Sequence, residues 1–168
     1  MWTALTDMPI LAHLLRPSAE HRLTVQRLLQ LLKPQFSVEG SIAMNQEKAV
    51  YQLFVRYLRE VSSGQRSCGD LNLNLEHILE FVTGASEEPL FGFEMAPGIK
   101  FSPASEVVVK KASSGDEETD GEPKVEGVFT PTSHTCGNIL QLPRPTPGLP
   151  LPQVERLFTS KGFTLGFL

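Results

Sequence analysis

The feature that most constrains the fold is an apolar stripe within residues 45–61. Its apolar positions recur at the spacing of one face of an α-helix, and charged residues occupy the other face. The apolar positions are Val50, Leu53, Phe54, Tyr57, Leu58 and Val61. Asn45 is the predicted N-cap of this helix, and Gly64 is predicted to end it. The stripe is therefore expected to form part of a protein core.

Three shorter stretches have the same helical periodicity. They are residues 19–33, the stretch between Asn74 and Gly84, and residues 152–161. Ser18 is the predicted N-cap of the first helix, Asn74 is that of the second, and Pro152 is the predicted first residue of the third. The first helix either packs on this domain or binds a partner.

Short β-rich runs follow the second helix. We expect residues 99–101 and 107–109 to pair as strands, and residues 139–142 indicate a further buried strand. Pro and Gly recur among apolar residues before the first of these runs, which indicates compact turns around a buried Phe91 or Phe93. Helices and short strands together predict an α+β domain.

Composition excludes several classes of protein. With 168 residues, 40% of them hydrophobic and 20% charged, the chain is long enough for one well-packed domain. The net charge of −4 argues against binding to nucleic acid or to an anionic membrane, and no apolar run approaches the ~20 residues that span a bilayer. The first residues lack the basic and apolar stretches of a secretory signal. Two cysteines do not make a disulfide framework, so we expect reduced thiols and a cytoplasmic or nuclear location.

The two cysteines differ in their surroundings. Cys136 ends a polar loop, immediately before the predicted strand of residues 139–142. A residue on a loop that a rigid strand holds is well placed for chemistry. Cys68 lies in a Ser- and Gly-rich stretch without the closely spaced ligands of a metal site. We interpret Cys68 as incidental and expect no metal or other cofactor.

Two blocks of sequence carry a resemblance to a known family. The first block comprises residues 131–136 (Pro-Thr-Ser-His-Thr-Cys), Asn138, Leu140, Leu142 and Pro143. The second block lies upstream and comprises residues 78–86 (Ile-Leu-Glu-Phe-Val-Thr-Gly-Ala-Ser), Pro89, Gly92 and Phe93. In this order the blocks resemble the catalytic loop, and the helix and turn that precede it, in the small lobe of HECT-type ubiquitin ligases.

The resemblance implies that Cys136 accepts ubiquitin as a thioester and passes it to a lysine of a protein substrate. Cysteine suits this exchange because it is both a nucleophile and a good leaving group, and its free pKa of about 8.5 leaves a modest thiolate fraction at neutral pH. The resemblance also places Thr135 at the active site. His134 either favours the thiolate, by a hydrogen bond or positive charge, or holds the loop by a hydrogen bond. In an extended loop, His134, Cys136 and Asn138 would share one face.

The resemblance also divides the chain into parts. Residues 1–35 would contain the last helix of the family's large lobe, residues 36–44 the hinge, and residues 45–168 the small catalytic lobe, with helices packed on a short mixed sheet. In the family the large lobe binds the ubiquitin-conjugating enzyme, so the expected partners are that enzyme, ubiquitin and a protein substrate. Residues 110–127 are a polar, acidic insert that cannot bury a core, and we expect a disordered loop or an acidic docking site.

Some features depart from the family pattern. The family commonly has an aromatic residue directly after the cysteine, where this chain has Gly137, and a tighter connection in place of the acidic insert. In the family a phenylalanine near the C-terminus helps the transfer to lysine; Phe163 matches it by motif, and Phe167 by distance from the end. The departures leave a non-catalytic module that binds ubiquitin or a ligase partner as the alternative function, whereas the intact Thr-Cys pair favours catalysis. A cysteine hydrolase has less support, because no acidic residue lies close to His134 in sequence to polarise it.

Overall fold

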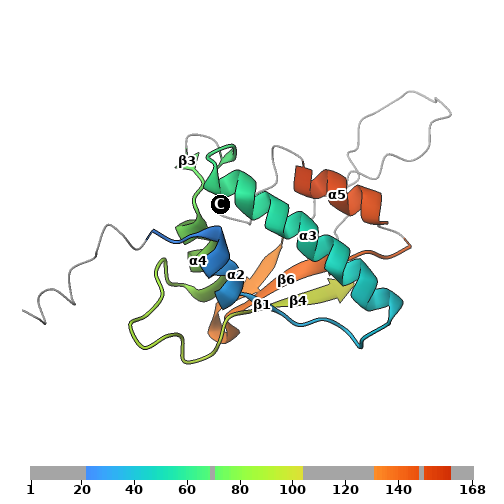
Figure 1. Ribbon diagram of the computed structural model, residues 1–168, viewed down its shortest axis with the longest axis horizontal. Coiled ribbons are helices and arrows are strands. Elements are labelled where there is room, and N and C mark those ends of the chain that lie inside the picture. Colours follow the sequence, from blue (N-terminus) through green and yellow to red (C-terminus); the bar gives the residue numbers. More distant parts are fainter. Residues whose placement is uncertain (1–21, 69–70, 104–130, 148–149, 160–168) are drawn as a thin grey trace, which may run out of the picture.

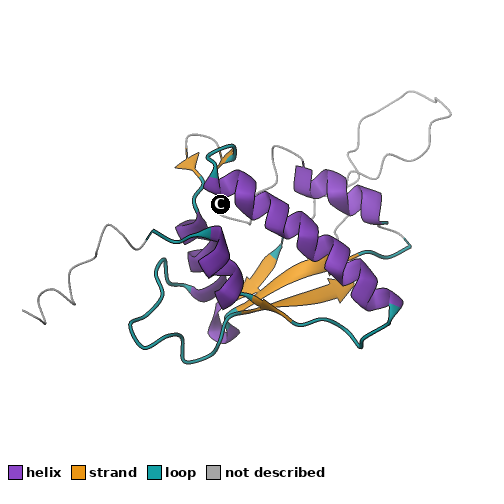
Figure 2. Ribbon diagram, viewed as in Figure 1, coloured by secondary structure: helices purple, strands orange, loops and turns teal. Residues whose placement is uncertain are grey.

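The computed structural model describes residues 22–68, 71–103, 131–147 and 150–159. These residues form helices and a small mixed sheet, so the prediction of an α+β domain is confirmed (Figure 2). The elements in chain order are α2 (Val25–Leu31), β1 (Lys33–Pro34), α3 (Ile42–Ser62), β2 (Ser67–Cys68), β3 (Leu71–Asn72), α4 (Leu75–Thr83), β4 (Gly98–Pro103), β5 (Thr132–His134), the 3₁₀ helix η2 (Thr135–Gly137), β6 (Ile139–Arg144) and α5 (Leu151–Thr159).

The main sheet has the strand order β1-β4-β6-β5. Strand β4 runs parallel to both β1 and β6, whereas β5 runs antiparallel to β6. Ile99, Leu140 and Ser133 are neighbours across the strands, and Ile99 and Leu140 are fully buried. At the next position along the strands, Gln141 of β6 pairs with Lys100 of β4 and with Thr132 of β5, and Lys100 and Thr132 are exposed. The sheet therefore turns one face to the core and presents polar side chains on the other.

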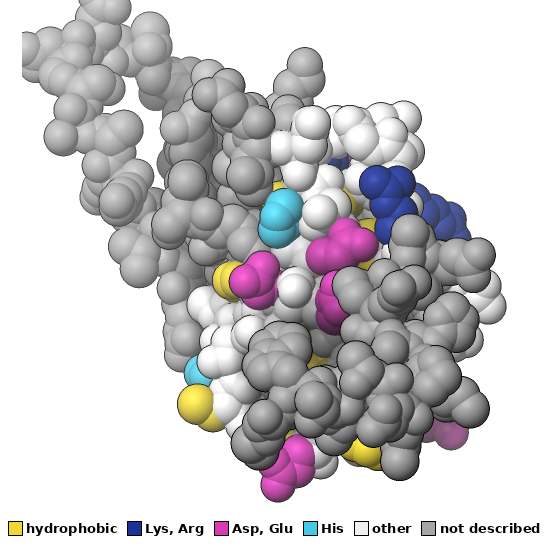
Figure 3. All heavy atoms as spheres, turned by 90° about the vertical axis from the view of Figure 1, so that its left-hand side faces the viewer, with side chains coloured by type: hydrophobic (Ala, Val, Ile, Leu, Met, Phe, Trp, Pro, Cys, Tyr) yellow, Lys and Arg dark blue, Asp and Glu magenta, His cyan; other side chains and the backbone are white. Residues whose placement is uncertain are grey.

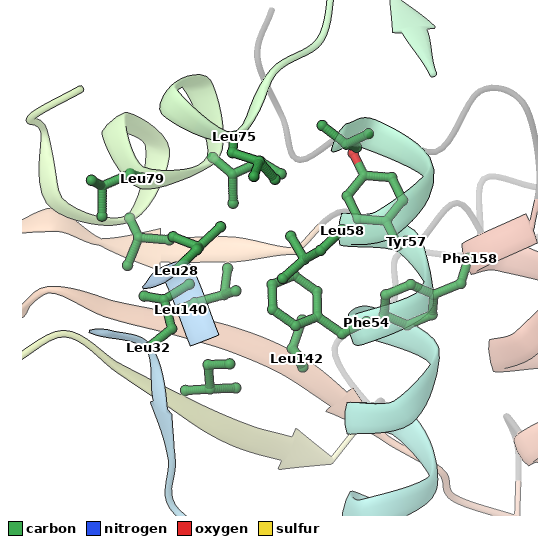
Figure 4. Close-up of a cluster of buried hydrophobic side chains, with 14 of the residues drawn as sticks. Leu28, Leu32, Phe54, Tyr57, Leu58, Leu75, Leu79, Leu140, Leu142 and Phe158 are labelled. Atoms are coloured by element: carbon green, nitrogen blue, oxygen red, sulfur yellow. The ribbon is translucent and has the colours of Figure 1, made fainter. Parts of the chain in front are cut away.

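Helix α3 crosses the sheet, with α5 beside it and with α2 and α4 at one end (Figure 1). Apolar side chains from these four helices and from β4 and β6 meet in one core (Figure 4). The predicted stripe of α3 lies in this core, and all of its members are buried except Leu53, which is half-buried. The largest fully buried side chains are Leu28, Leu32, Phe54, Tyr57, Leu58, Ile78, Leu79, Ile99, Leu140, Leu142 and Phe158.

Helix α3 begins earlier than predicted. Its N-cap is Ser41, whose hydroxyl accepts a hydrogen bond from the Met44 N–H at 3.0 Å, so the prediction that Asn45 caps this helix is wrong. A serine with extended backbone satisfies one of the free N–H groups at the helix start, and Asn45 then lies within the first turns of the helix. The predicted end is confirmed, because Gly64 follows α3 with φ +72°.

Helix α2 is shorter than its sequence pattern predicts. Its N-cap is Thr24, whose hydroxyl accepts a hydrogen bond from the Arg27 N–H at 3.1 Å; the predicted cap, Ser18, lies outside the described residues. The helix ends at Leu31, so the predicted end at Lys33 is wrong. Lys33 belongs to β1, which pairs with the start of β4. Pairing with a distant strand thus replaces the last turn of the predicted helix.

The segment from α2 to α3 is part of the same folded body. Leu28 and Leu32 are fully buried in the common core. The backbone N–H and the hydroxyl of Ser37 each donate to the buried carboxylate of Glu47 at 2.7 Å. Helix α2 therefore packs on this domain, which is one of the two alternatives that its sequence leaves open. The division into a large-lobe helix, a hinge at residues 36–44 and a small lobe stays a prediction.

Helix α4 has both predicted caps. The Asn74 side chain accepts from the His77 N–H at 2.9 Å, and the Asn74 N–H donates to His77 Nδ1 at 3.3 Å, which completes a capping box. Gly84 ends the helix with φ +77°, a conformation that favours glycine. In the turns that follow, Phe93 is half-buried against the core and Phe91 is fully exposed. Burial of Phe91 is therefore ruled out, and Phe93 is the aromatic residue that the turns enclose.

Helix α5 begins at Leu151 and buries Val154 and Phe158. The end predicted for it near residue 161 lies outside the described residues. The same is true of the predicted strand of residues 107–109 and of the acidic insert.

The face shown in Figure 3 carries charges of both signs. It is the end of the molecule where α2 and α4 lie. Acidic side chains lie near the centre of this view, with basic side chains and a histidine beside them. Within the described ranges, no helix is long and apolar enough to cross a membrane.

Candidate active site

Cys136 lies in the turn of a β-hairpin. Strands β5 and β6 pair in antiparallel register up to His134 and Ile139, and residues 135–138 connect them. The first part of this connection is the 3₁₀ helix η2, in which Cys136 is a free thiol exposed to solvent. The chain thus places the cysteine at one end of the sheet, where β6 begins (Figure 1).

The shape of the turn depends on Asn138. Its φ of +52° and ψ of +41° are left-handed, and among the described residues it is the only non-glycine residue with positive φ. Asparagine adopts this conformation more readily than most residues do. The Asn138 N–H donates to the backbone oxygen of Thr135 at 3.3 Å, which closes the 3₁₀ turn around Cys136.

Two further hydrogen bonds hold Asn138 against the residues at the start of β4. Its side-chain Nδ2 donates to the backbone oxygen of Met95 at 2.7 Å. Its own backbone oxygen accepts from the Gly98 N–H at 2.9 Å. Met95 is 43 positions away in sequence, so the Cys136 turn is attached to a distant part of the chain.

Residues 95–98 are in turn supported by β1 on their other side. The Lys33 N–H donates to the backbone oxygen of Pro97 at 3.3 Å. Gly98 has little room for a larger residue, because a Cβ there would lie 3.3 Å from Gln35 Nε2 and 3.4 Å from the Lys33 oxygen. The missing side chain lets β1, β4 and β6 approach one another closely beside the turn.

His134 and Thr135 precede Cys136 and are exposed. Neither side chain has a hydrogen bond or ion pair with another residue that the structure describes. The loop-anchoring hydrogen bond considered for His134 is therefore not found there, and Asn138 anchors the turn instead. The turn is also not extended, so the extended geometry that would place His134, Cys136 and Asn138 on one face is wrong. Catalytic roles for His134 and Thr135 stay predictions.

The backbone of the turn does not require a glycine at position 137. Gly137 does not have a positive φ. A Cβ there would meet only Ile139 Cγ1, at 3.7 Å, which is an ordinary van der Waals contact. The turn therefore has room for the Cβ of a larger residue at position 137, where the family commonly has an aromatic residue.

The remaining residues singled out in the sequence are either outside the described ranges or in another element. Phe163 and Phe167 lie outside the described residues. Cys68 belongs to β2, which follows α3 and pairs with β3 in a separate hairpin. Over the described ranges, no group of His, Cys, Asp and Glu side chains is placed to hold a metal ion.

The anchoring role of Asn138 is not among the sequence predictions. The Gly-Asn pair before an apolar run is a turn signal, and it points to a left-handed residue at this place. The partner of the Asn138 side chain has no such signal, because Met95 contributes only a backbone oxygen.

An open groove of about 330 Å³ lies between α3 and α5. It is lined by Ala49, Gln52, Leu53, Arg56, Leu151 and Glu155. Arg56 Nη1 lies 3.5 Å from Glu155 Oε1 across it. Cys136 does not line this groove and is exposed on the hairpin turn.

The likeness to a known family depends on the sequence motifs around this site. A scan against models of known protein families finds no match to the chain, and a search of curated proteins finds no significant match. The site that carries a functional argument is therefore the hairpin turn itself: an exposed cysteine whose backbone is held by two strands and by residues 95–98.

Proposed function

We propose that this chain is the catalytic lobe of a HECT-type ubiquitin ligase. In this proposal Cys136 accepts ubiquitin from a conjugating enzyme as a thioester and passes it to a lysine of a protein substrate. The observation that carries the proposal is a free, exposed thiol on a hairpin turn, within a motif that resembles the family's catalytic loop.

Both steps are acyl transfers at the sulfur of Cys136. The thiolate attacks the carbonyl carbon of the donor thioester, and the donor cysteine leaves as a thiolate when the new C–S bond has formed. The neutral amine of lysine then attacks the same carbon and displaces the Cys136 thiolate, which breaks the C–S bond. The proton that the amine loses passes to solvent or to the released sulfur, and Cys136 is ready for another cycle.

The geometry of the turn suits a donor as large as a protein. Cys136 and the two residues before it are exposed, so a bulky thioester can reach the sulfur. The backbone of the turn is meanwhile held by β5, β6 and the bond from Asn138 to Met95. An accessible nucleophile on a fixed backbone supports the proposal because productive transfer depends on orientation as well as encounter.

The neighbouring residues have subsidiary roles in this proposal. His134 is proposed to favour the thiolate by positive charge, since its side chain has no hydrogen bond in the described structure. Thr135 either donates its hydroxyl toward the thioester or fixes the turn. Phe163 acts in the second step, when the lysine amine must be held in line with the loaded thioester.

The test is thioester formation on this chain fused behind a HECT large lobe, which supplies the docking site for the conjugating enzyme. With activating enzyme, conjugating enzyme, ubiquitin and ATP, we expect a ubiquitin adduct on a non-reducing gel that a thiol reductant removes. Cys136→Ala should abolish the adduct, and the matched variant Cys68→Ala should retain it. Cys136→Ser should give an adduct that resists the reductant, because an oxygen ester does not exchange with thiols.

An adduct that survives in Cys136→Ala and disappears in Cys68→Ala would contradict the assignment. If the folded wild-type chain forms no adduct but binds ubiquitin in a titration, the alternative of a non-catalytic binding module is favoured. The chain without the fused lobe should load poorly, because diffusive encounter then replaces docking and lowers the effective concentration of the donor.

A further inference from the structure

We propose that Asn138 is a positioning residue for Cys136, and that it acts through its bond to the backbone of Met95. The proposal rests on the proposed function, since the reaction that it serves is the transfer of ubiquitin through Cys136. Asn138 does not touch the reacting atoms in this account. It fixes the backbone from which the thiol projects.

The first reason is that Asn138 is attached on both sides. Its N–H closes the turn onto Thr135 at 3.3 Å, and its backbone oxygen accepts from Gly98 at 2.9 Å. Its Nδ2 adds the bond to Met95 at 2.7 Å. One residue thus connects the internal geometry of the Cys136 turn with the residues that lead into β4.

The second reason is that few side-chain hydrogen bonds fix the turn, although helix α4 also lies against η2 and β5. Strand β5 contains only residues 132–134, and the side chains of Thr135 and Cys136 have no hydrogen-bond partner among the described residues. A short strand with an exposed turn is easily displaced unless a contact from outside the hairpin holds it. The bond from Asn138 to Met95 is such a contact.

The third reason is that the residues just after Met95 are held from both sides. Residues 97 and 98 lie between β1 and β6, with a hydrogen bond from Lys33 on one side and the bond to Asn138 on the other. The close packing at Gly98 limits movement of this segment. The position of the thiol is thus fixed relative to the sheet and not only within its own turn. Such fixing matters for transfer, since misplacement of a reacting group by ~1 Å lowers a rate by about 100-fold.

The test separates the side-chain bond from the backbone conformation. Asn138→Gly keeps access to the left-handed region but removes the whole side chain, the amide and the Cβ together. Asn138→Asp keeps a side chain of the same shape but turns an oxygen toward the Met95 oxygen. Asn72→Ala, at an exposed position in β3, is the matched control. All variants are made in the full chain fused behind the HECT large lobe.

Single-turnover transfer from the ubiquitin-loaded conjugating enzyme to Cys136 is the main measurement. For Asn138→Gly and Asn138→Asp we expect the saturated rate to fall by about 10-fold to 100-fold, with little change in the donor concentration that gives half the maximal rate. The control should keep the wild-type rate. A loss caused by unfolding would instead lower the thermal midpoint and affect binding as well, and circular dichroism of each variant checks this.

Hydrogen exchange on the chain without ubiquitin gives a second readout. The amides of residues 135–139 should exchange at least about 10-fold faster in both Asn138→Asp and Asn138→Gly, while those of α3 stay protected. Unchanged exchange, or a transfer rate within about 2-fold of wild type in both folded variants, would overturn the positioning role. If the wild-type chain forms the thioester and the Asn138 variants do so at the same rate, only this inference is refuted. If the wild-type chain forms no thioester, both the proposed function and this inference are refuted.

Discussion

Replacing Leu28 by alanine tests whether α2 belongs to the core of this domain. Leu28 is 0% exposed and lies in the cluster that also holds Leu79 of α4 and Leu140 of β6 (Figure 4). The substitution removes buried methyl groups and leaves a cavity, and such changes cost about 2–5 kcal/mol. Full burial places the expected loss in the upper part of that range, at about 3–5 kcal/mol. This is a large share of the roughly 5–15 kcal/mol by which a domain is stable.

Urea denaturation followed by far-UV circular dichroism measures the effect. With a slope of about 2 kcal/mol per molar urea, the midpoint of unfolding should fall by roughly 1.5–2.5 M for Leu28→Ala. Leu90→Ala is the matched control, because Leu90 is the same residue type and 78% exposed. That variant should unfold close to the wild-type midpoint.

Equal midpoints for Leu28→Ala and Leu90→Ala would refute the reasoning. The helix would then not contribute to the core of this domain, and its assignment to a separate large lobe would gain support. A large loss for Leu28→Ala means that a fragment beginning at residue 36 lacks part of its own core. Such a fragment should fail to fold, which circular dichroism also reports.

Three further outcomes are expected. Glu47→Ala should lower the free energy of unfolding by about 1.5–3 kcal/mol in urea denaturation, because it removes charge-assisted hydrogen bonds at a site that is 2% exposed. The control is Glu39→Ala, at an exposed position, and an equal loss in the two variants would contradict this reasoning. Gly137→Ala should leave the thermal midpoint almost unchanged, since a Cβ there meets only an ordinary contact, and a marked loss would show that the turn needs glycine. In the fused ligase, Phe163→Ala should leave thioester formation intact and slow the discharge of ubiquitin to lysine, more than Phe167→Ala does; full-rate discharge by Phe163→Ala would show that the family resemblance does not extend to this residue.

The helices of this protein are largely determined by local sequence. The stripe of α3, the Asn74 cap of α4 and the glycine that ends α4, Gly84, can all be recognised from residues close together in the chain. This is possible because helical hydrogen bonds and caps join residues only three or four positions apart. Even the wrong prediction of Asn45 as a cap differs from Ser41 by about one helical turn.

The strands are determined less well, because their partners are distant. The run around Ile99 is recognisable as a strand, but nothing in the local sequence shows that Lys33 and Pro34 pair with its start. The helical periodicity of the sequence extends α2 to Lys33. In the structure, pairing with the edge of β4 places Lys33 in β1 instead. Strand pairing depends on residues far apart in sequence, so only the folded chain reveals it.

At the candidate site, too, local sequence determines one part and the tertiary structure determines the other. The motif around Cys136 is a local signal, and it identifies the cysteine, its polar loop and the strand that follows. The anchor of that loop is not local, because the Asn138 side chain bonds to a backbone oxygen 43 positions away and that oxygen belongs to no motif. A backbone carbonyl is chemically the same at every residue. Only the tertiary structure, which brings residues 95–98 beside the turn, could decide which carbonyl holds the cysteine in place.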